Sequence, residues 1–448
     1  MDQTLILNKI LEQQNLNIEE SMYIFNKIMS GELDDIKITS ILIGLKLKGE
    51  TKEEIIGAAK VMREKSLKIN SPQNTIDTCG TGGDMKDTLN ISTSAAIVAA
   101  SAGVTIAKHG NRSVSSKSGS ADMLEKIGYK ITNNVEDLEN SLSNKNFCFL
   151  FAQNHHSAMK NVINVRKNLA TRTIFNLLGP LTNPAKASKQ LLGVYSRDLV
   201  SMHCNCLKEL GSEKAMVVHG LDGLDEISLS DNTLINELKD NKVLEYSFDP
   251  RDYGYDLIKL EDIKGGDPEY NANCFNKMIN GDFIKFQMIV EINAGAAIYL
   301  SNLRNNLKDS FDLAKIINLP FELQSDFSFS INGQGFDEEN LKSSVVGQMN
   351  NVIINNYPYK KIMINGDVSD KQFTGSLIVD DNNLNLNFDG LINYSNDLVE
   401  YDFNANIKKA NLDEIKLSKV KKQSVLGNIS AKLVGENFQS MIGDIYFN

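Results

Sequence analysis

Segment 77–84 of the sequence, Asp-Thr-Cys-Gly-Thr-Gly-Gly-Asp, is a glycine-rich turn that follows a short apolar strand. A helix is expected to begin near Asn90 and to carry the hydroxyls of Ser92 and Thr93. Glycines allow backbone N–H groups to converge on an anion, and a helix N-terminus adds the positive end of its dipole. The pattern predicts a phosphate cradle, although a glycine cluster alone fits a tight structural turn equally well. It is neither the P-loop nor the dinucleotide-binding fingerprint, because their spacings are absent.

A second polar segment, residues 108–122, concentrates cations and hydroxyls in a chain that is acidic as a whole. Its cations are Lys108, Arg112 and Lys117, and five serines accompany them. Cations together with hydroxyl donors suit a second phosphate or a substrate with several negative charges. The alternative is a solvated serine-rich loop.

Two further segments carry charged residues that could bind a substrate or a metal ion. Arg166 has the fork geometry to hold a substrate carboxylate, although such an arginine taken singly is more often a surface ion-pair residue. Asp225 and Glu226 follow an apolar strand at a loop. Mg²⁺ takes one or two carboxylates, phosphate oxygens and water. An acidic pair in a turn is usually just solvated, but beside two anion-binding loops we favour chelation of a metal–diphosphate.

Length and composition limit the protein class. The chain has 448 residues, 42% of them hydrophobic and 23% charged, which is typical of a soluble protein of two or three domains. Its net charge of −10 disfavours general binding to nucleic acid or anionic membranes. No stretch approaches the roughly 20 apolar residues of a membrane span. Five cysteines without a secretory signal indicate reduced thiols and a cytoplasmic protein.

The elements that must position these residues change in character along the chain. Residues 1–72 are predicted to be helical, with a cap at Asn17 and a capping box from Thr51 to Glu54. Residues 73–318 alternate apolar strands, glycine-rich turns and helices, which predicts an α/β domain with a largely parallel sheet. The expected strands are 75–79, 104–107, 147–151 and 214–219, with helices beginning near Ile292 and spanning 307–317.

Residues 319–448 differ again, because apolar residues alternate there with period two. All histidines and cysteines lie before this segment. Stretches such as 327–331, 384–388 and 399–407 predict antiparallel β-hairpins with one apolar face, and 379–384 predicts a turn between two of them.

The four polar segments, in this order, resemble anthranilate phosphoribosyltransferases, whose fold is shared with the nucleoside phosphorylases. The resemblance covers about residues 1–317 and rests on motifs such as Gly-Thr-Gly-Gly-Asp, Asn-Ile-Ser-Thr, Lys-His-Gly-Asn-Arg and His-Gly-x-x-Gly-x-Asp-Glu. It implies a helical domain followed by an α/β domain. It also implies transfer of the phosphoribosyl group of 5-phosphoribosyl-1-diphosphate to anthranilate, with release of diphosphate, in tryptophan biosynthesis.

The resemblance also assigns site residues, with no acid or base among them. It implies a homodimer formed through the helical domain and two Mg²⁺ ions held by Ser92, Asp225 and Glu226. Anthranilate would be held by Asn111 and Arg166, with Gly80 nearby. Contacts to the phosphoribosyl donor would come from Gly80, Gly83, Asp84, Thr88, Asn90, Ile91, Ser92, Thr93, Lys108, Ser116 and Ser120.

The sequence departs from the family pattern in a few places. Met85 and Ala170 stand where the family commonly has glycine, and Gln153 and Ser157 where it has proline. These changes concern the fine geometry of the acceptor site. The expected last helix of the enzyme stops near Ile317, where the β-rich segment begins.

Two other functions remain open from the sequence. One is a pyrimidine nucleoside phosphorylase-like enzyme, which shares the fold. The other is a non-catalytic envelope or lipid-binding protein, because residues 320–448 resemble a fragment of the AsmA-like proteins of the translocation-and-assembly-module type. Such a fragment has no evident mechanistic link to amino-acid synthesis, so the sequence suggests a fusion of unrelated parts.

Overall fold

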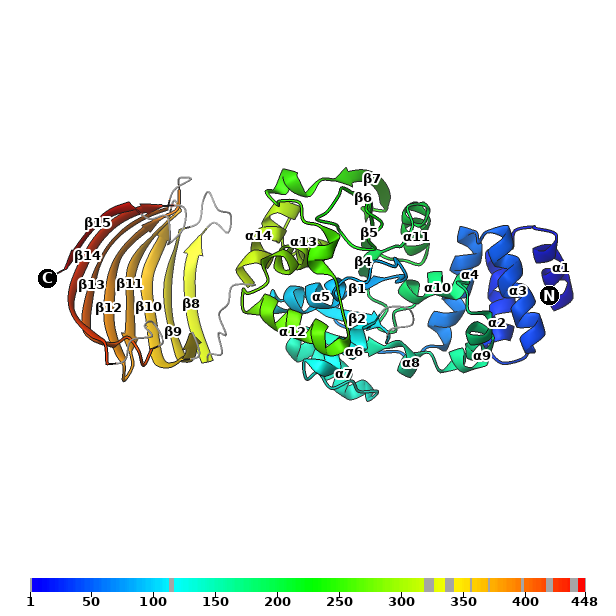
Figure 1. Ribbon diagram of the computed structural model, residues 1–448, viewed down its shortest axis with the longest axis horizontal. Coiled ribbons are helices and arrows are strands. Elements are labelled where there is room, and N and C mark those ends of the chain that lie inside the picture. The colour runs from blue at the N-terminus through cyan, green and yellow to red at the C-terminus, as the bar shows by residue number, and fades with distance from the viewer. Residues whose placement is uncertain are drawn as a thin grey trace. The chain divides into compact units, whose positions relative to one another are not determined.

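The chain folds into two compact units, Met1–Leu319 and Pro320–Asn448, in the computed structural model (Figure 1). The structure describes residues 2–112, 117–317, 326–334, 342–354, 357–369, 371–395, 399–415, 422–435 and 442–447.

The first unit begins with a bundle of four helices. The predicted cap at Asn17 and the predicted capping box at Thr51 are confirmed: the side chain of Asn17 accepts the Glu20 N–H, and that of Thr51 accepts the Glu54 N–H. Glu54 is fully buried and is paired with Lys48 at 2.9 Å, so its charge is compensated inside the bundle. The four helices are α1 (Gln3–Leu11), α2 (Ile18–Met29), α3 (Asp35–Lys48) and α4 (Lys52–Lys65).

A seven-stranded sheet forms the centre of the first unit, in the order β3-β2-β1-β4-β5-β6-β7. The first five strands of this order are parallel, and β6 and β7 are antiparallel. Because the chain winds outwards from β1 in one direction and from β4 in the other, the neighbours β1 and β4 mark a topological switch point, where open α/β sheets bind ligands. The strands are β1 (Ile76–Gly80), β2 (Ile106–Gly110), β3 (Phe147–Phe151), β4 (Lys189–Gly193), β5 (Lys214–Gly220), β6 (Thr233–Lys239) and β7 (Lys242–Phe248).

Both faces of the parallel part of this sheet are buried, as expected for parallel strands, whereas the edge strand β7 is largely exposed. Along β5, Met216 and Val218 enter one hydrophobic core with the helices α5 (Ile91–Ser101) and α13 (Ile284–Ser301). Ala215 and Val217 enter another core, which is shared with α11 (Asp198–Glu209) and the helix bundle. The bundle is thus fixed to the sheet by a common core.

Several predicted boundaries shift in the structure. Helix α13 begins at Ile284 and not near Ile292, because Phe286, Ile289 and Val290 already pack in the core. Strands β4, β6 and β7 were missed. The remaining helices are α6 (Ser120–Lys126), α7 (Val135–Lys145), α8 (Ala152–His155), α9 (Ile163–Leu169), α10 (Ile174–Leu178), α12 (Pro268–Ile279) and α14 (Leu307–Ile317).

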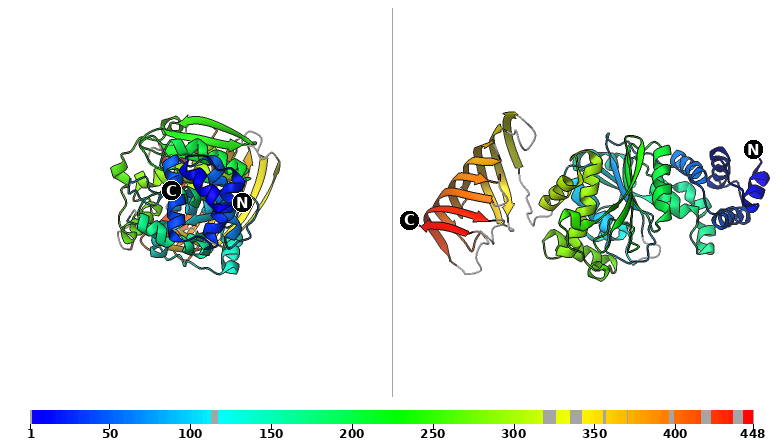
Figure 2. Two further views of the ribbon diagram at one scale, coloured as in Figure 1. Left: turned by 90° about the vertical axis from the view of Figure 1, so that its right-hand side faces the viewer. Right: turned by 90° about the horizontal axis from the view of Figure 1, so that it is seen from above.

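The second unit is one curved antiparallel sheet in which every strand pairs with its neighbour in sequence (Figure 2). The predicted hairpins are confirmed, and Asp381 N–H donates to the Leu384 carbonyl within the predicted turn. A small cluster around Tyr359, Ile362 and Val379 forms its core. Its strands are β8 (Asp326–Gln334), β9 (Lys342–Ile354), β10 (Tyr357–Ser369), β11 (Gln372–Asp380), β12 (Leu384–Asn393), β13 (Val399–Asn411), β14 (Ser424–Gly435) and β15 (Ile442–Phe447).

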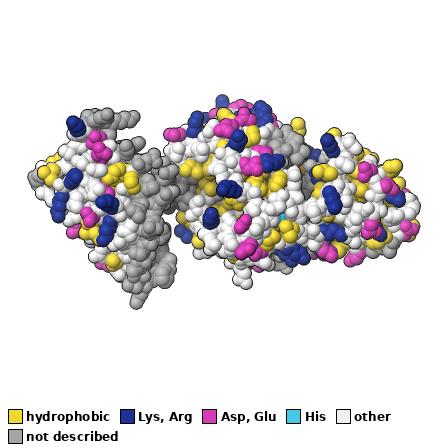
Figure 3. Space-filling model, turned by 90° about the horizontal axis from the view of Figure 1, so that it is seen from below, with side chains coloured by type: hydrophobic (Ala, Val, Ile, Leu, Met, Phe, Trp, Pro, Cys, Tyr) yellow, Lys and Arg dark blue, Asp and Glu magenta, His cyan; other side chains and the backbone are white. Residues whose placement is uncertain are grey.

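The surface of the first unit carries charges of both signs. On the face drawn in Figure 3, acidic and basic side chains are interspersed over the first unit.

In the described part of the chain no single helix is long and apolar enough to cross a membrane. Only α12 and α13 taken together meet that test, and they are bent by 83°. Most of α13 is buried in the core of the first unit.

Candidate active site

The glycine-rich turn leaves the carboxyl end of β1 and folds over the end of β4. Thr81 N–H donates to the Gly193 carbonyl over 2.9 Å, and the Thr81 hydroxyl accepts the Tyr195 N–H over 3.1 Å. Gly82 and Gly83 have φ angles of 64° and 78°, a left-handed conformation that favours glycine. The turn therefore sits at the topological switch point with its backbone free to approach a ligand closely.

Two of the departures from the family pattern fall on left-handed backbone. Met85 has a φ of 60° and Ala170 a φ of 47°. A side chain in this conformation costs about 1 kcal/mol or more relative to glycine. The loop after Asp84 and the end of α9 are thus strained at these residues.

The acidic turn after β5 reaches across to the glycine-rich turn and to helix α5. The Asp225 Oδ2 accepts the Gly82 N–H over 3.1 Å, and the Glu226 Oε1 accepts the Ser92 N–H over 3.0 Å. A Cβ atom at Gly193 would lie 1.6 Å from the Asp225 carbonyl oxygen, so only glycine fits there. These contacts place both predicted carboxylates beside the predicted phosphate cradle.

The two carboxylates lie in surroundings that resist negative charge. Burial raises the pKa of Asp225 well above its usual value, and the neighbouring Asp84 and Glu226 raise it further. Burial likewise raises the pKa of Glu226 to about 7, although Lys108 and the hydrogen bonds from Ser92 act in the opposite direction. Both residues are partly exposed, so a cation can reach them.

Lys108 is a cation that acts on this acidic group, because its charge lowers the pKa of Glu226. It is 1% exposed, and its ammonium donates to the Thr78 carbonyl and, over 3.3 Å, to the Ser92 hydroxyl. Burial lowers its pKa, whereas attraction from Asp77 and from Glu226 raises it. Lys108 is thus held rigidly under the first turn of α5, where a phosphate would bind.

The acidic turn fits a magnesium ion that is shared with a substrate. Within the ranges that the structure describes, no group of three or more His, Cys, Asp or Glu side chains is arranged to hold a metal alone. Mg²⁺ is usually bound by one or two carboxylates together with phosphate oxygens and water. Asp225 and Glu226 supply that number of ligands, and their raised pKa values mark an uncompensated charge that a cation would relieve.

The other predicted donor residues gather at the start of α5. The Thr93 hydroxyl donates to the Ser120 hydroxyl over 2.9 Å, which joins α5 to α6. The Asn90 amide donates to the Ser118 carbonyl and accepts from Asn271 of α12 over 2.8 Å. Sequence reasoning missed Asn271, since nothing nearby in the chain marks it. The Ile91 side chain is buried and its N–H already donates to the Leu89 carbonyl.

The serine-rich segment 108–122 matches its prediction as an anion-binding loop only in part. Residues 113–116, including Ser116, lie outside the described part of the chain. Arg112 forms ion pairs with Asp122 and Glu125 at 2.8 Å each, so this cation is already engaged by carboxylates. Thr88 forms an isolated bridge with Lys264.

The two residues expected to hold the acceptor lie on different elements. Asn111 follows β2, and its side-chain oxygen is 3.4 Å from the Gln153 amide nitrogen. Arg166 lies on α9 with its guanidinium 5.4 Å from the centre of the Phe175 ring. Within the described chain it forms no ion pair, and burial lowers its pKa. Arg172, which the sequence did not single out, donates to the Gly83 carbonyl and covers the Tyr195 ring.

The histidines and cysteines take structural positions. The rings of His109 and His156 lie 5.2 Å apart, and burial lowers the pKa of His156 to about 4, so it stays neutral. His203 Nδ1 and Nε2 lie 3.1 Å and 3.2 Å from backbone carbonyls. Cys204 and Cys206 are buried free thiols.

Comparison with known proteins places the first unit in one family. The profile described as glycosyl transferase family, a/b domain, matches residues 72–317, and the helical bundle domain of that family matches residues 4–66. The anthranilate phosphoribosyltransferase of Thermoanaerobacter sp. (strain X514) is 47% identical over 312 residues, which are 69% of this chain and 92% of that protein. That of Methanobrevibacter smithii is 44% identical over 309 residues, 69% and 92% of the two chains.

Solved structures give the same result. The crystal structure of anthranilate phosphoribosyltransferase from Thermus thermophilus matches with a TM-score of 0.66 and 36% identity, covering 70% of this chain and 94% of that one. The enzyme from Saccharomyces cerevisiae in complex with PRPP and Mg matches with a TM-score of 0.64 and 26% identity, covering 70% and 93%.

Replacing Gly193 by alanine tests the close approach of the acidic turn. We expect Gly193→Ala to displace Asp225 and Glu226 and to lower transferase activity by about 100-fold, since misplacement of about 1 Å costs that much. Gly179→Ala is the matched control, because a Cβ atom there meets nothing within 4 Å. Steady-state rates compare the two variants. Equal rates would contradict the proposed role of the contact.

The raised pKa values predict how Mg²⁺ stabilises the protein at different pH. The pKa of Glu226 is raised to about 7 in the folded state, above its value in the unfolded chain. The free energy of unfolding of the metal-free protein therefore falls as the pH rises towards 7, because the carboxyl must ionise inside the fold. Mg²⁺ must displace protons at about pH 6 but fewer at about pH 8, so it should raise the unfolding temperature more at the higher pH.

Thermal unfolding with and without MgCl₂ at the two pH values measures this difference. The variant D225N/E226Q serves as the control and should show no pH-dependent magnesium effect. A magnesium effect of the same size at both pH values in the unsubstituted protein would contradict the assignment.

Proposed function

The chain belongs to the anthranilate phosphoribosyltransferase family, and from this premise we propose how its residues divide the work of the reaction. The enzyme transfers the phosphoribosyl group of 5-phosphoribosyl-1-diphosphate to the amine of anthranilate, a step of tryptophan biosynthesis that releases diphosphate. The comparisons support this activity and not the nucleoside phosphorylase or envelope-protein alternatives. The observation that carries it is the joining of the glycine-rich turn, α5 and the acidic turn at one sheet edge.

The phosphoribosyl donor binds against the end of β1 and the start of α5. Backbone N–H groups around Gly83 and the Ser92 hydroxyl donate to its phosphates, and the helix dipole of α5 favours their negative charge. Thr93 contributes by donating to the Ser120 hydroxyl, whose own proton remains available to a phosphate. Lys108 supplies a fixed positive charge beneath them. Its hydrogen bond to the Thr78 carbonyl keeps this charge in place without rearrangement during the reaction. The other donor contacts in this proposal are Gly80, Asp84, Thr88, Asn90, Ile91, Ser116 and Ser120.

Magnesium is the metal of this reaction, in keeping with the yeast enzyme solved with PRPP and Mg. When bound, Mg²⁺ offsets the charge that develops on the departing diphosphate. In our proposal Asp225, Glu226 and Ser92 hold two such ions. The hydrogen bonds from Gly82 and Ser92 orient the two carboxylates, so that the remaining lone pairs are available to the metal.

Anthranilate approaches from the side of α9, with Gly80 nearby. The yeast enzyme is also solved with 4-fluoroanthranilate. Arg166, which has no carboxylate partner of its own in the described chain, binds the anthranilate carboxylate, and Asn111 orients the ring substituents. The amine lone pair forms the bond to the anomeric carbon while the bond to diphosphate breaks and its electron pair leaves with diphosphate. The amine proton then passes to water, so no strong base is required.

The helix bundle is proposed to join two copies of the chain into a homodimer. Leu5 of α1 is 65% exposed, and Ile36 and Leu47 of α3 are each 79% exposed. Large apolar residues on two packed helices of a water-soluble enzyme are typical of an interface. We also place the enzyme in the cytoplasm, since its five cysteines are free thiols.

The second unit is proposed to be an appended segment that the reaction does not use. Every residue assigned a role lies before residue 227. Its curved antiparallel sheet is compatible with the AsmA-like resemblance, which rests on sequence alone.

Removing Asp225 and Glu226 tests the proposed function. In a fluorescence assay of anthranilate consumption, D225A/E226A should lose at least about 100-fold in rate, because the leaving diphosphate loses its metal-mediated stabilisation. Its residual rate should no longer depend on Mg²⁺. The matched control D231A/E245A also removes two carboxylates, both from exposed positions. Magnesium-dependent activity at the parental level in D225A/E226A would contradict the assignment of these two carboxylates as magnesium ligands.

Deleting the second unit tests its proposed dispensability. A chain that ends at Leu319 should keep kcat and both KM values within about twofold of the full chain, because the first unit contains its own cores and all assigned residues. Steady-state kinetics of both chains make the comparison. A tail that proves necessary for activity would refute this proposal.

A further inference from the structure

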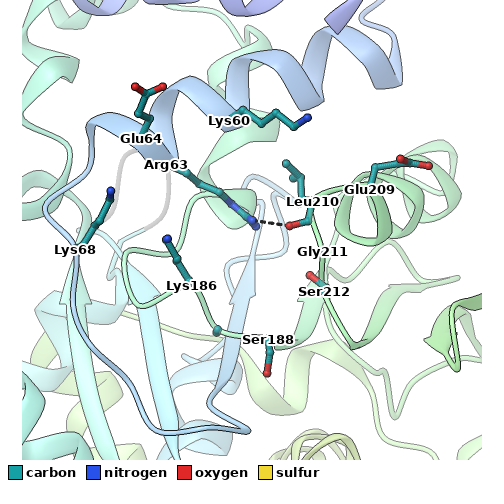
Figure 4. A pocket seen from close by; sticks show the side chains of 11 residues that line it. Lys60, Arg63, Glu64, Lys68, Lys186, Ser188, Glu209, Leu210, Gly211 and Ser212 are labelled. Carbon is teal, nitrogen blue, oxygen red and sulfur yellow. Dashed lines mark hydrogen bonds between the residues drawn. The ribbon is translucent and has the colours of Figure 1, made fainter.

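A second cavity lies in the first unit, away from the site just described. It measures about 460 Å³ and opens between the end of α4, the turn before β4 and the turn before β5 (Figure 4). Cavities of this size are typical of small-molecule sites. Its lining residues are Lys60, Arg63, Glu64, Lys68, Lys186, Ala187, Ser188, Glu209, Leu210, Gly211 and Ser212.

The cavity is at the opposite edge of the sheet from the phosphate cradle. Ser188 and Ser212 precede β4 and β5, whereas the cradle lies at the carboxyl ends of the strands. At about 3.3 Å per residue, the five residues of β4 separate the two edges by roughly 13 Å and the seven of β5 by roughly 20 Å. A ligand in this cavity is therefore distinct from the substrates.

Arg63 forms the rigid centre of the cavity wall. Its Nε donates to the Leu181 carbonyl over 2.6 Å, and its Nη1 to the Leu210 carbonyl over 3.1 Å. The guanidinium has further N–H groups besides these two, and Arg63 lines the cavity. Burial lowers the pKa of Arg63 to about 10, and no carboxylate in the described chain is paired with it. A desolvated cation without a counter-charge is unfavourable, and an anion would relieve it.

Three lysines add to this charge. Lys60, Lys68 and Lys186 are exposed and form no ion pair within the described residues. Figure 4 shows Arg63 and Lys186 extending towards the same space from opposite walls. It also shows the carboxylate of Glu64 directed away from that space. The cavity is thus cationic in a chain whose net charge is −10.

We propose that this cavity, which we call the α4 pocket, binds a small anion with two or more phosphate groups. The Arg63 guanidinium offers a planar fork for phosphate oxygens, and the lysines supply mobile point charges around it. Ser188 and Ser212 also line the cavity.

Calorimetric titration of the full chain with inorganic diphosphate, in EDTA, tests the α4 pocket. The variant K68E/K186E reverses two of its charges without touching Arg63 or any residue of the active site. The matched control is Lys277→Glu on the exposed side of α12. We expect the parent and K277E to bind one more diphosphate per chain than K68E/K186E, with kcat unchanged within about twofold in all three.

Equal stoichiometry in the parent and K68E/K186E would overturn the proposal, as would an equal loss in K277E. Should the double variant unfold at a lower temperature, the single variant K186E decides by the same criterion. Since transferase activity is measured separately, failure of the pocket does not affect the assigned reaction.

Discussion

The close approach between the backbone of Asp225 and Gly193 is the contact on which the active site depends. It brings the turn after β5 over the end of β4, within hydrogen-bonding distance of the glycine-rich turn and of α5. No side chain can occupy that point, so the geometry is set by backbone packing and not by attraction between charged groups. Indeed the charges oppose it, because it assembles Asp225 and Glu226 near Asp84 in surroundings that raise their pKa values.

The sheet supplies the rigidity that keeps these like charges together. Both of its faces are buried, one against α5 and α13 and the other against α11 and the helix bundle. A packed core resists continuous deformation, so the turns at its edge keep their positions even when their charges repel. In the mechanism we propose, this electrostatic cost is recovered when a metal ion and a diphosphate bind between the turns.

The two ends of the strands in this sheet carry different kinds of side chain. Glycines and carboxylates gather where β1 and β4 end, whereas the α4 pocket gathers cations where β4 and β5 begin. Arg63 links the pocket to the helix bundle through carbonyls of the α/β part. The second unit has a small core of its own around Ile362.

The sequence alone determined the local elements and the types of chemistry. Capping boxes at Asn17 and Thr51, the strand 147–151 and the hairpins of the second unit follow from short-range pattern, because caps and period-two alternation involve residues near one another in the chain. The loops predicted to bind phosphate and metal were recognised from residue type.

Which of these residues come into contact depends on how the strands and helices pack in three dimensions. Asn271 lies far along the chain from Asn90, which it positions. Arg112 is engaged by Asp122 of its own segment and by Glu125 beyond it, a pairing that residue type alone did not reveal. The requirement for glycine at Gly193 arises from a backbone that approaches it through space. Such contacts depend on strand order and packing, which residue spacing does not encode.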